Sequence, residues 1–322
     1  MLAVTCVSQS DTDPLAGLEV GERPEPQVPD GWTTVRLRTT ALNHHDLFSL
    51  RGVGLPADRL PMVLGCDGAG VDAEGNEVLV HAVVASPGWT GDETLDPRRS
   101  LLSEVHDGTL AEVVAVPRHN LVPRPEGLSW EHAACLPTAW LTAYRMLFTN
   151  SGVQPGGTVL VQGAAGGVAT AIVQLGTAAG IRVWVTSRDA AKGEQAVALG
   201  ADRAFETGAR LPERVDAVME TVGAATWSHS VNSLRPGGTI VISGATSGDA
   251  PAKAELTKIF FKQLRVVGST MGTRDELARL ARFVVDAGIE PRVDSVRPLA
   301  EAREGFERMV HGSLSGKVVF TL

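Results

Sequence analysis

A glycine-rich turn carries the clearest chemical signal in the sequence. It follows an apolar run at residues 158–161, which predicts a short buried strand, and it precedes an apolar helical segment at residues 168–179. Glycines at such a junction allow a sharp turn and bring amides at the helix N-terminus close to a pyrophosphate. The spacing, Gly163-x-x-Gly166-x-x-Ala169, differs from the strict GxGxxG pattern. The residues predicted to contact a dinucleotide here are Gly163, Ala164, Gly166, Gly167 and Val168.

The end of the next predicted strand, residues 181–186, bears on which dinucleotide would bind. A fold that prefers NAD places an acidic residue there, about 20 residues past the glycines. This chain instead carries Ser187, Arg188 and Lys192, whose hydroxyl and positive charges suit a 2′-phosphate. Asp189 lies past the strand end, where we expect it to cap the following helix. The pattern favours NADPH, and an α/β domain that binds no nucleotide remains the alternative.

The composition is that of a globular protein with room for two domains. The chain has 322 residues, 43% of them hydrophobic and 20% charged, and its formal net charge is −8. The acidic balance argues against nucleic acid and membrane surfaces as partners, and no apolar run reaches membrane-spanning length. The three cysteines are scattered and the N-terminus lacks the features of a signal peptide. We therefore expect a cytoplasmic protein without disulfides.

The elements that would position the glycine turn divide the chain into parts. Short alternating strands before residue 125 predict a β-rich domain. From residue 158 strands and helices alternate, which predicts an α/β domain with a parallel sheet covered on both faces. The last strand, 317–321, has no partner in that sheet and is expected to return to the first domain. The strands expected in the first domain are residues 32–40, 77–84 and 109–116.

Motifs along nearly the whole chain resemble the medium-chain dehydrogenase/reductase superfamily, nearest to its zinc-independent NADPH:quinone oxidoreductase-like branch. The resemblance rests first on residues 41–52, 61–70 and 133–144. The later motifs are residues 163–168, 235–238, 244–248, 268–272 and 316–317. Ala169 departs from the family, in which a third glycine is usual, and residues 71–76 are shorter than the family's loop.

The resemblance implies a fold and a domain order. A β-rich GroES-like catalytic domain would be interrupted by a Rossmann domain, which is a doubly wound parallel sheet, and would resume after it. The implied boundaries are 1–124 for the first part of the catalytic domain, 125–272 for the Rossmann NADP-binding domain and 273–322 for the return segment. The family further implies a substrate cleft between the domains and a homodimer.

Zinc-dependent members of the family hold a catalytic metal with cysteine, histidine and cysteine. The matching positions in this chain carry Asn43, Cys66 and Thr138. An amide and a hydroxyl are poor zinc ligands. Residues 86–105, which match a four-cysteine lobe of those relatives, contain no cysteine. We therefore expect no metal, and a zinc-type alcohol dehydrogenase with unusual ligands is the alternative.

Without a Lewis acid, the easier hydride acceptors are those that spread negative charge, so the expected substrate is a small electrophile, a quinone or an enone. The family places Asn43 at the metal position, where its amide could donate a hydrogen bond. His45 matches a proton-relay hydroxyl and could supply a proton near neutral pH. Asp46 is expected to brace the loop, and a purely structural pairing of His45 with Asp46 is the simpler alternative. Tyr144, the only tyrosine, is expected to pack within a helix.

The family also implies which further residues line the cofactor. Thr142 would approach the nicotinamide ribose or the pyrophosphate. Lys317 could contact the pyrophosphate, although a solvated strand residue is the plain alternative. The other implied positions are Thr138, Val222, Gly244, Ala245, Thr246, Met271 and Gly272. A non-catalytic NADPH-binding sensor on the same fold stays open, since a fold alone does not establish chemistry.

Overall fold

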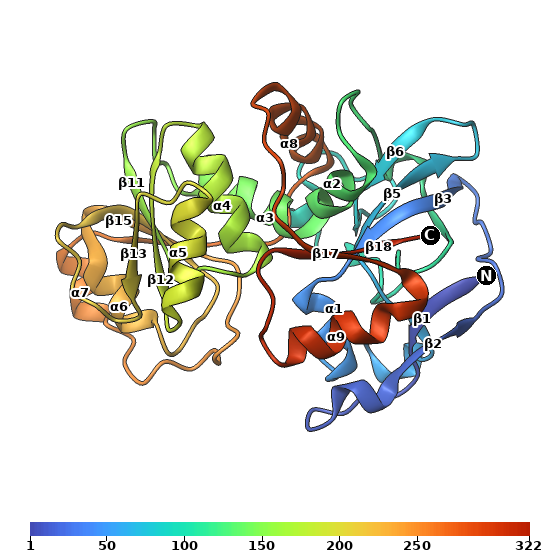
Figure 1. Cartoon of the computed structure of the whole chain (residues 1–322), viewed down its shortest axis with the longest axis horizontal. Coiled ribbons are helices and arrows are strands. Elements are labelled where there is room, and N and C mark those ends of the chain that lie inside the picture. Colours follow the sequence, from blue (N-terminus) through green and yellow to red (C-terminus); the bar gives the residue numbers. More distant parts are fainter. The chain divides into compact units, whose positions relative to one another are not determined.

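The computed structural model describes the whole chain, residues 1–322, as two compact units. The β-rich unit comprises Met1–Leu141 and Met271–Leu322, and the α/β unit is the continuous segment Thr142–Thr270, coloured green to orange in Figure 1. The first boundary follows Leu141 rather than residue 124, because helix α2 (Trp130–Cys135) packs against strands β3, β5 and β18 of the β-rich unit. The α/β unit is therefore an insertion, as the resemblance implies.

The main sheet of the β-rich unit is built from both ends of the chain. Its strand order is β10-β6-β5-β3-β18-β17, and β9 pairs with β3 beside this path. Alternate side chains of β3 are buried, as the sequence pattern predicts for a strand with one covered face. The bounds are β3 (Trp32–Ala41), β5 (Asp67–Asp72), β6 (Glu77–Val80), β9 (Val113–Pro117), β10 (Leu121–Pro123), β17 (Val293–Pro298) and β18 (Lys317–Thr321).

The return of the last strand to the first domain is confirmed. β18 pairs antiparallel with β3 and parallel with β17, with Val319 opposite Ala41. The expected strand at 77–84 is wrong in extent, because the Asn120 amide binds the carbonyls of His81 and Val83 and separates β6 from β7 (Val83–Val84). The expected strand at 109–116 begins only at Val113, since Leu110 pairs with Leu64 instead.

Smaller elements complete the β-rich unit. Strands β1 (Leu2–Cys6), β2 (Leu18–Glu22) and β4 (Met62–Val63) form a three-stranded sheet, and β7 pairs with β8 (Ser100–Leu101). The helices are α1 (His44–Leu50), α2, α8 (Arg274–Asp286) and α9 (Ala302–Val310). Side chains of β1, α1, α9 and β18 share one apolar core, in which Phe306 and Phe320 are fully buried.

The α/β unit contains six parallel strands in the order β13-β12-β11-β14-β15-β16. Counted from β11, this is the order 3-2-1-4-5-6 of a Rossmann sheet, and the order reverses between β11 and β14. Ligands of such sheets bind at the carboxyl ends of the strands at this reversal. The bounds are β11 (Thr158–Val161), β12 (Arg182–Ser187), β13 (Arg203–Glu206), β14 (Val215–Glu220), β15 (Leu234–Ile242) and β16 (Arg265–Gly268).

Four helices connect these strands: α4 (Gly167–Ala178), α5 (Ala190–Ala198), α6 (Trp227–Ser233) and α7 (Leu256–Phe261). A short helix, α3 (Leu141–Tyr144), leads into the unit. Strand β13 is absent from the sequence prediction, because it is a short edge strand that is largely exposed and carries charged residues at both ends. None of the helices combines the length and the apolar composition needed to cross a membrane.

Candidate cofactor and active site

The glycine turn has the local structure that its sequence predicts. Gly163 adopts a φ of +87°, a conformation in which an L side chain is strained. Gly166 is the N-cap of α4, and a Cβ built on it would meet no atom within 4 Å. Other parts of the protein therefore leave room beside Gly166 at the start of this 12-residue helix. Free amides at a helix N-terminus bind phosphate groups, so the turn fits a dinucleotide pyrophosphate.

The end of β12 shows how Asp189 is used. Its carboxylate accepts hydrogen bonds from the amides of Ala191 at 2.9 Å and Lys192 at 3.4 Å, which confirms it as the N-cap of α5. The Ser187 hydroxyl donates to the Asp189 carbonyl at 2.7 Å. Arg188, between them, is exposed. The carboxylate of Asp189 is therefore bound to the helix, while the Arg188 side chain is exposed.

The turns after β14 and β15 lie against each other and against the glycine turn. A Cβ built on Gly163 would lie 3.9 Å from Cγ2 of Val222. The amide of Thr246 donates to the Thr221 carbonyl at 3.3 Å, and the amide of Ser247 donates to the Val222 carbonyl at 2.7 Å. The structure thus places on adjacent turns, at the carboxyl ends of β11, β14 and β15, the following predicted cofactor residues of the α/β unit: Gly163, Ala164, Gly166, Gly167, Val168, Val222, Gly244, Ala245 and Thr246.

The remaining predicted cofactor residues fall on both sides of the unit boundaries. Thr142 is buried in the α/β unit, whereas Thr138, Met271 and Gly272 belong to the β-rich unit. Thr138 lies in a π-helical segment, Leu136–Trp140, and its hydroxyl is buried without a hydrogen-bond partner. Helical bulges of this type occur often at functional sites. Met271 adopts a left-handed φ of +49°, which is uncommon for a residue with a side chain.

The catalytic candidates Asn43 and Asp46 begin helix α1. The backbone N–H of Asn43 donates to Asp46 Oδ2 at 2.8 Å, and the backbone N–H of Gly65 donates to Asp46 Oδ1 at 2.9 Å. Asp46 is fully buried, and this burial raises the pKa of its carboxyl group from 3.8 to about 6 against the opposing effects of His45 and Lys317. The carboxylate therefore joins two loops, as expected of a bracing residue.

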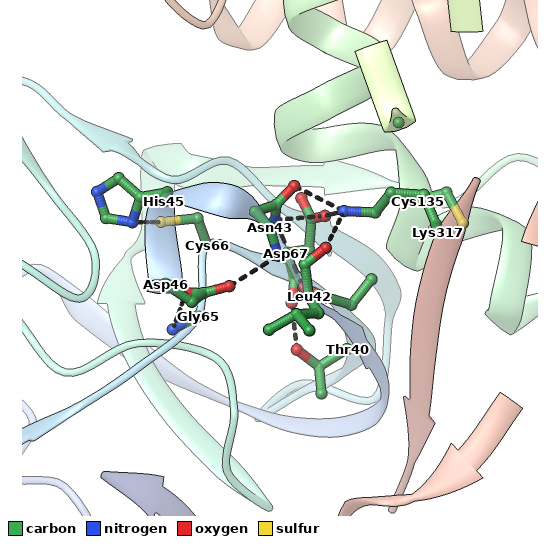
Figure 2. A network of polar contacts seen from close by, with 12 residues as sticks. Thr40, Leu42, Asn43, His45, Asp46, Gly65, Cys66, Asp67, Cys135 and Lys317 are labelled. Carbon is green, nitrogen blue, oxygen red and sulfur yellow. Dashed lines mark hydrogen bonds and ion pairs between the residues drawn. The ribbon is translucent and has the colours of Figure 1, made fainter. Parts of the chain in front are cut away.

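Lys317 forms the centre of a buried polar network (Figure 2). Its ammonium donates to Asn43 Oδ1 at 2.6 Å, to Asp67 Oδ2 at 2.8 Å and to the Leu42 carbonyl at 2.7 Å. The Asn43 amide nitrogen also donates to Asp67 Oδ2, at 2.8 Å. Lys317 and Asp67 are buried, so Lys317 is not the solvated strand residue considered from sequence. Contact between Lys317 and a pyrophosphate would require these bonds to break.

His45 belongs to a second cluster, with Cys66, Ser103 and Glu104. Its Nε2 lies 2.9 Å from Glu104 Oε1, and its Nδ1 lies 3.5 Å from Cys66 Sγ and 3.4 Å from Ser103 Oγ. Burial lowers the pKa of His45, but the contacts with Cys66 and Glu104 outweigh it, so the pKa is raised well above 6.5. The structure therefore pairs His45 with Glu104 in place of Asp46, the partner considered in the structural alternative.

Sequence reasoning missed Ser103 and Glu104. They lie far from His45 in the chain, in a loop without periodic hydrophobicity. Ser103 adopts a left-handed φ of +65°, which turns three consecutive groups toward His45 and Cys66: the Leu102 carbonyl, the Ser103 hydroxyl and the Glu104 carboxylate. No residue type at these positions signals that geometry.

The donor set at this place does not fit zinc. Asn43 and Thr138 offer an amide and a hydroxyl, and both polar atoms of the Asn43 side chain already bind Lys317 and Asp67. Both ring nitrogens of His45 contact protein groups. Nowhere in residues 1–322 do three or more His, Cys, Asp or Glu side chains form a group able to hold a metal ion.

Comparisons with known proteins agree with this architecture. A family model described as an alcohol dehydrogenase GroES-like domain matches residues 29–126, and one described as a zinc-binding dehydrogenase matches residues 167–286. A zinc-type alcohol dehydrogenase-like protein of Schizosaccharomyces pombe is 30% identical, over 96% of this chain and 97% of the relative. The acryloyl-coenzyme A reductase of Metallosphaera sedula is also 30% identical, over 95% of this chain and 96% of the relative.

Solved structures show the same relationship. An NAD-dependent alcohol dehydrogenase superposes with a TM-score of 0.91 at 34% identity, and 100% of each chain is covered. The 2-octenoyl-CoA carboxylase reductase CinF, in complex with NADP and 2-octenoyl-CoA, superposes with a TM-score of 0.88 at 25% identity, over 99% of this chain and 87% of CinF.

A Rossmann unit inserted in a GroES-like unit, with a glycine turn at the sheet reversal, defines an oxidoreductase that uses a nicotinamide cofactor. The chain belongs to the medium-chain dehydrogenase/reductase superfamily.

Proposed function

We propose that this protein is an NADPH-dependent reductase of a small electrophile, a quinone or an activated alkene, and that it works without a catalytic metal. The observation that carries the proposal is the set of contacts made by residues at positions that match zinc ligands. Asn43 is bonded to Lys317 and Asp67, and Cys66 contacts His45. These side chains bind other side chains of the same protein, and they do not form a set of metal ligands.

The acceptor class follows from this chemistry. Bound NADPH supplies a hydride, and reduction of a plain carbonyl group would then leave an alkoxide that needs a Lewis acid or a well-placed donor. A quinone or a conjugated alkene spreads the negative charge over its own atoms. The relatives support this class, because the Metallosphaera protein is an acryloyl-coenzyme A reductase and CinF is crystallised with an enoyl thioester.

The proton is assigned to His45. Its side chain is 23% exposed, Glu104 Oε1 lies 2.9 Å from Nε2, and the contacts with Cys66 and Glu104 favour the charged ring, which raises its pKa well above 6.5. A group that is protonated near the working pH can act as a general acid, and His45 would do so once its contact with Glu104 or with Cys66 opens. Asp46 fixes the backbone around His45 by accepting the backbone N–H groups of Asn43 and Gly65. Asn43 would act as a donor to substrate only if its bond to Asp67 opened.

The preference for NADPH rests on the turn after β12. Asp189 caps α5 and is bonded to the amides of Ala191 and Lys192, so its charge is used by the helix. Arg188 is exposed and could pair with a 2′-phosphate, with Ser187 and Lys192 in the same turn; the Ser187 hydroxyl would first have to leave the Asp189 carbonyl. CinF, which is crystallised with NADP, supports this choice, while the NAD-dependent alcohol dehydrogenase opposes it.

We further propose that the protein is a homodimer of a reducing, cytoplasmic compartment. Strand β16 is an edge strand whose outer side has no partner in the chain, and exposed edges of this kind pair readily. Nearby in sequence, Phe260 is 62% exposed and Phe261 is 75% exposed. All three cysteines are free. The mass in solution, measured by light scattering with and without the replacement of both phenylalanines by Ser, tests the dimer.

The decisive experiment measures NADPH oxidation with a quinone, an enone and an enoyl-CoA thioester, before and after treatment with a chelator, together with the metal content of the purified protein. We expect turnover of at least one acceptor that the chelator leaves unchanged. A stoichiometric metal whose removal abolishes turnover would instead favour a zinc-type alcohol dehydrogenase. Binding of NADPH without turnover of any acceptor would favour a sensor.

A further inference from the structure

Polar side chains are buried beneath the cofactor turns of the α/β unit, at the carboxyl ends of β11, β12 and β14. Glu220, at the end of β14, is 1% exposed, and most of the others are fully covered. Buried polar groups are costly unless each finds a partner, so their arrangement is informative. The members of this cluster, which we call the switch-point network, are Gln162, Thr186, Glu220, Thr226, His229 and Ser230.

One end of the switch-point network holds the glycine turn. The amide of Gly163 donates to the Thr186 hydroxyl at 3.3 Å, and that hydroxyl donates to Gln162 Oε1 at 2.7 Å. The Gln162 amide nitrogen then donates to Ser230 Oγ at 3.0 Å and contacts His229 Nδ1 at 2.9 Å. The turn that faces the expected pyrophosphate is thus tied from below to helix α6.

The other end holds the turn after β14. Ser230 donates to Glu220 Oε2 at 2.6 Å. Glu220 Oε1 accepts the amides of Val222 at 2.8 Å and Gly223 at 2.9 Å, and both its oxygens lie 2.9 Å from the Thr226 hydroxyl. A carboxylate with this many donors fixes the backbone that it binds.

The directions of these bonds leave one arrangement. Ser230 has a single proton, which goes to the carboxylate of Glu220, so Ser230 must accept from the Gln162 nitrogen. This sets the amide orientation of Gln162, whose oxygen then faces the donating Thr186 hydroxyl. His229 accepts at Nδ1 and donates from Nε2 to the Ala209 carbonyl, 2.9 Å away. Each bond in the path therefore depends on its neighbours.

We propose that the switch-point network positions the glycine turn and the Val222–Gly223 turn as one unit for the dinucleotide, with Glu220 and Ser230 as positioning residues. The inference rests on the proposed cofactor site. Its physical reason is that Val222 lies beside Gly163, so a shift of either turn moves both walls of the expected pyrophosphate and nicotinamide site. Neither Glu220 nor Ser230 would touch the cofactor.

Helix α6 offers a matched pair of variants. Ser230 and Ser233 are both buried, but Ser233 donates to the His229 carbonyl at 2.8 Å and lies 3.4 Å from His229 Nε2. Ser233 bonds neither to Gln162 nor to Glu220, the two residues that Ser230 joins. The test compares Ser230→Ala with Ser233→Ala in two measurements. The first is backbone hydrogen exchange of the cofactor-free protein at residues 162–167 and 221–224, and the second is the Kd for NADPH.

We expect Ser230→Ala to speed exchange at both turns and to weaken NADPH binding, each by about tenfold, which corresponds to the loss of one hydrogen bond. Ser233→Ala should change neither beyond about twofold. Faster exchange at only one turn, or equal effects of the two variants, would overturn the proposal, as would an unchanged Kd for NADPH in Ser230→Ala. A wild-type protein that binds no NADPH would refute the proposed function, while exchange at the two turns would still decide whether they move as one unit.

Thr186→Val provides a second route to the same answer from the opposite end. It removes the acceptor of the Gly163 amide without touching Glu220, which is two hydrogen-bonded side chains away. If the network acts as a unit, Thr186→Val speeds exchange at residues 221–224 as well, and the effects of Thr186→Val and Ser230→Ala on exchange are not additive. Additive, purely local effects would overturn the proposal.

Discussion

Lys317 and Asn43 are 274 positions apart in the chain, yet the ammonium of Lys317 donates to Asn43 Oδ1 at 2.6 Å inside the β-rich unit. Together with Asp67 they form a buried group of cation, amide and carboxylate. The positive charge there belongs to a side chain that is covalently part of the last strand. Its bonds to Asn43 and Asp67 stabilise the buried charge and join the last strand to the segments that carry those two residues.

The first prediction concerns the stability that Lys317 provides. In Lys317→Met the carboxylate of Asp67 would stay buried without its cation, and its Oδ1 already has no hydrogen-bond partner. We expect the free energy of unfolding to fall by about 3–5 kcal/mol, measured by urea denaturation. The control is Arg282→Ala, which breaks the exposed pair with Asp286 and should cost about 0.5 kcal/mol or less. Similar losses in the two variants would contradict a buried pair.

The second prediction concerns the pH dependence of stability through Asp46. Its folded pKa, about 6, lies above the ordinary 3.8, so the folded state holds this proton more tightly than the unfolded chain. The stabilisation is complete below about pH 4 and is lost as pH rises through about 6, by roughly 3 kcal/mol. Asp46→Asn removes the titrating group. The difference in unfolding free energy between the wild type and Asp46→Asn, measured by urea denaturation, should therefore change by about this amount as pH rises from 4 to 7, because only the wild type loses stability through this group. A pH-independent difference between the two would rule out this origin.

The third prediction concerns the pairing of His45 with Glu104. Burial lowers the pKa of His45, whereas Cys66 and then Glu104 raise it, so Glu104→Gln removes one of the raising contacts and should move this pKa downward. Titration by NMR checks it, with the His45 signal identified by its loss in His45→Asn. Glu74→Gln, which removes an exposed carboxylate paired with Arg118, should leave the signal in place. In a folding assay, the His45 contribution is present at low pH and disappears as pH rises through its raised pKa.

The fourth prediction concerns the choice between NADPH and NADH. Arg188→Ala should raise the KM for NADPH by about tenfold, the value of one charge-assisted hydrogen bond, and should leave the KM for NADH nearly unchanged. Arg182→Ala is the matched control, because Arg182 is an exposed arginine at the opposite end of β12 that pairs with Glu213. Equal changes with both cofactors would show that Arg188 does not read the 2′-phosphate.

Much of the fold is accessible from the sequence because its signals are local. The glycine turn between a buried strand and a buried helix is written within residues 158–179, and it predicts the core of the α/β unit. The return of residues 317–321 to the first sheet follows from their lack of a partner elsewhere. Asp189 could be recognised as a cap because capping depends only on the next few residues.

The polar clusters could not be read in the same way, because they depend on contacts between distant loops. Glu104 reaches His45 only through the left-handed backbone of Ser103, and no pattern in the sequence marks that turn. Lys317 is buried because Asp67 and Asn43 surround it, although a lysine near a chain end ordinarily faces water. A one-dimensional pattern carries no information on which of many polar residues will meet.

The position of β18 has a consequence for the order in which the two units can fold during synthesis. This strand lies between β3 and β17 in the main sheet, yet the whole inserted unit separates it from β3 in the chain. The inserted Rossmann unit is one uninterrupted segment and can fold while the ribosome is still adding residues. The β-rich unit lacks the partner of β3 on that side until residues 317–321 have been synthesised.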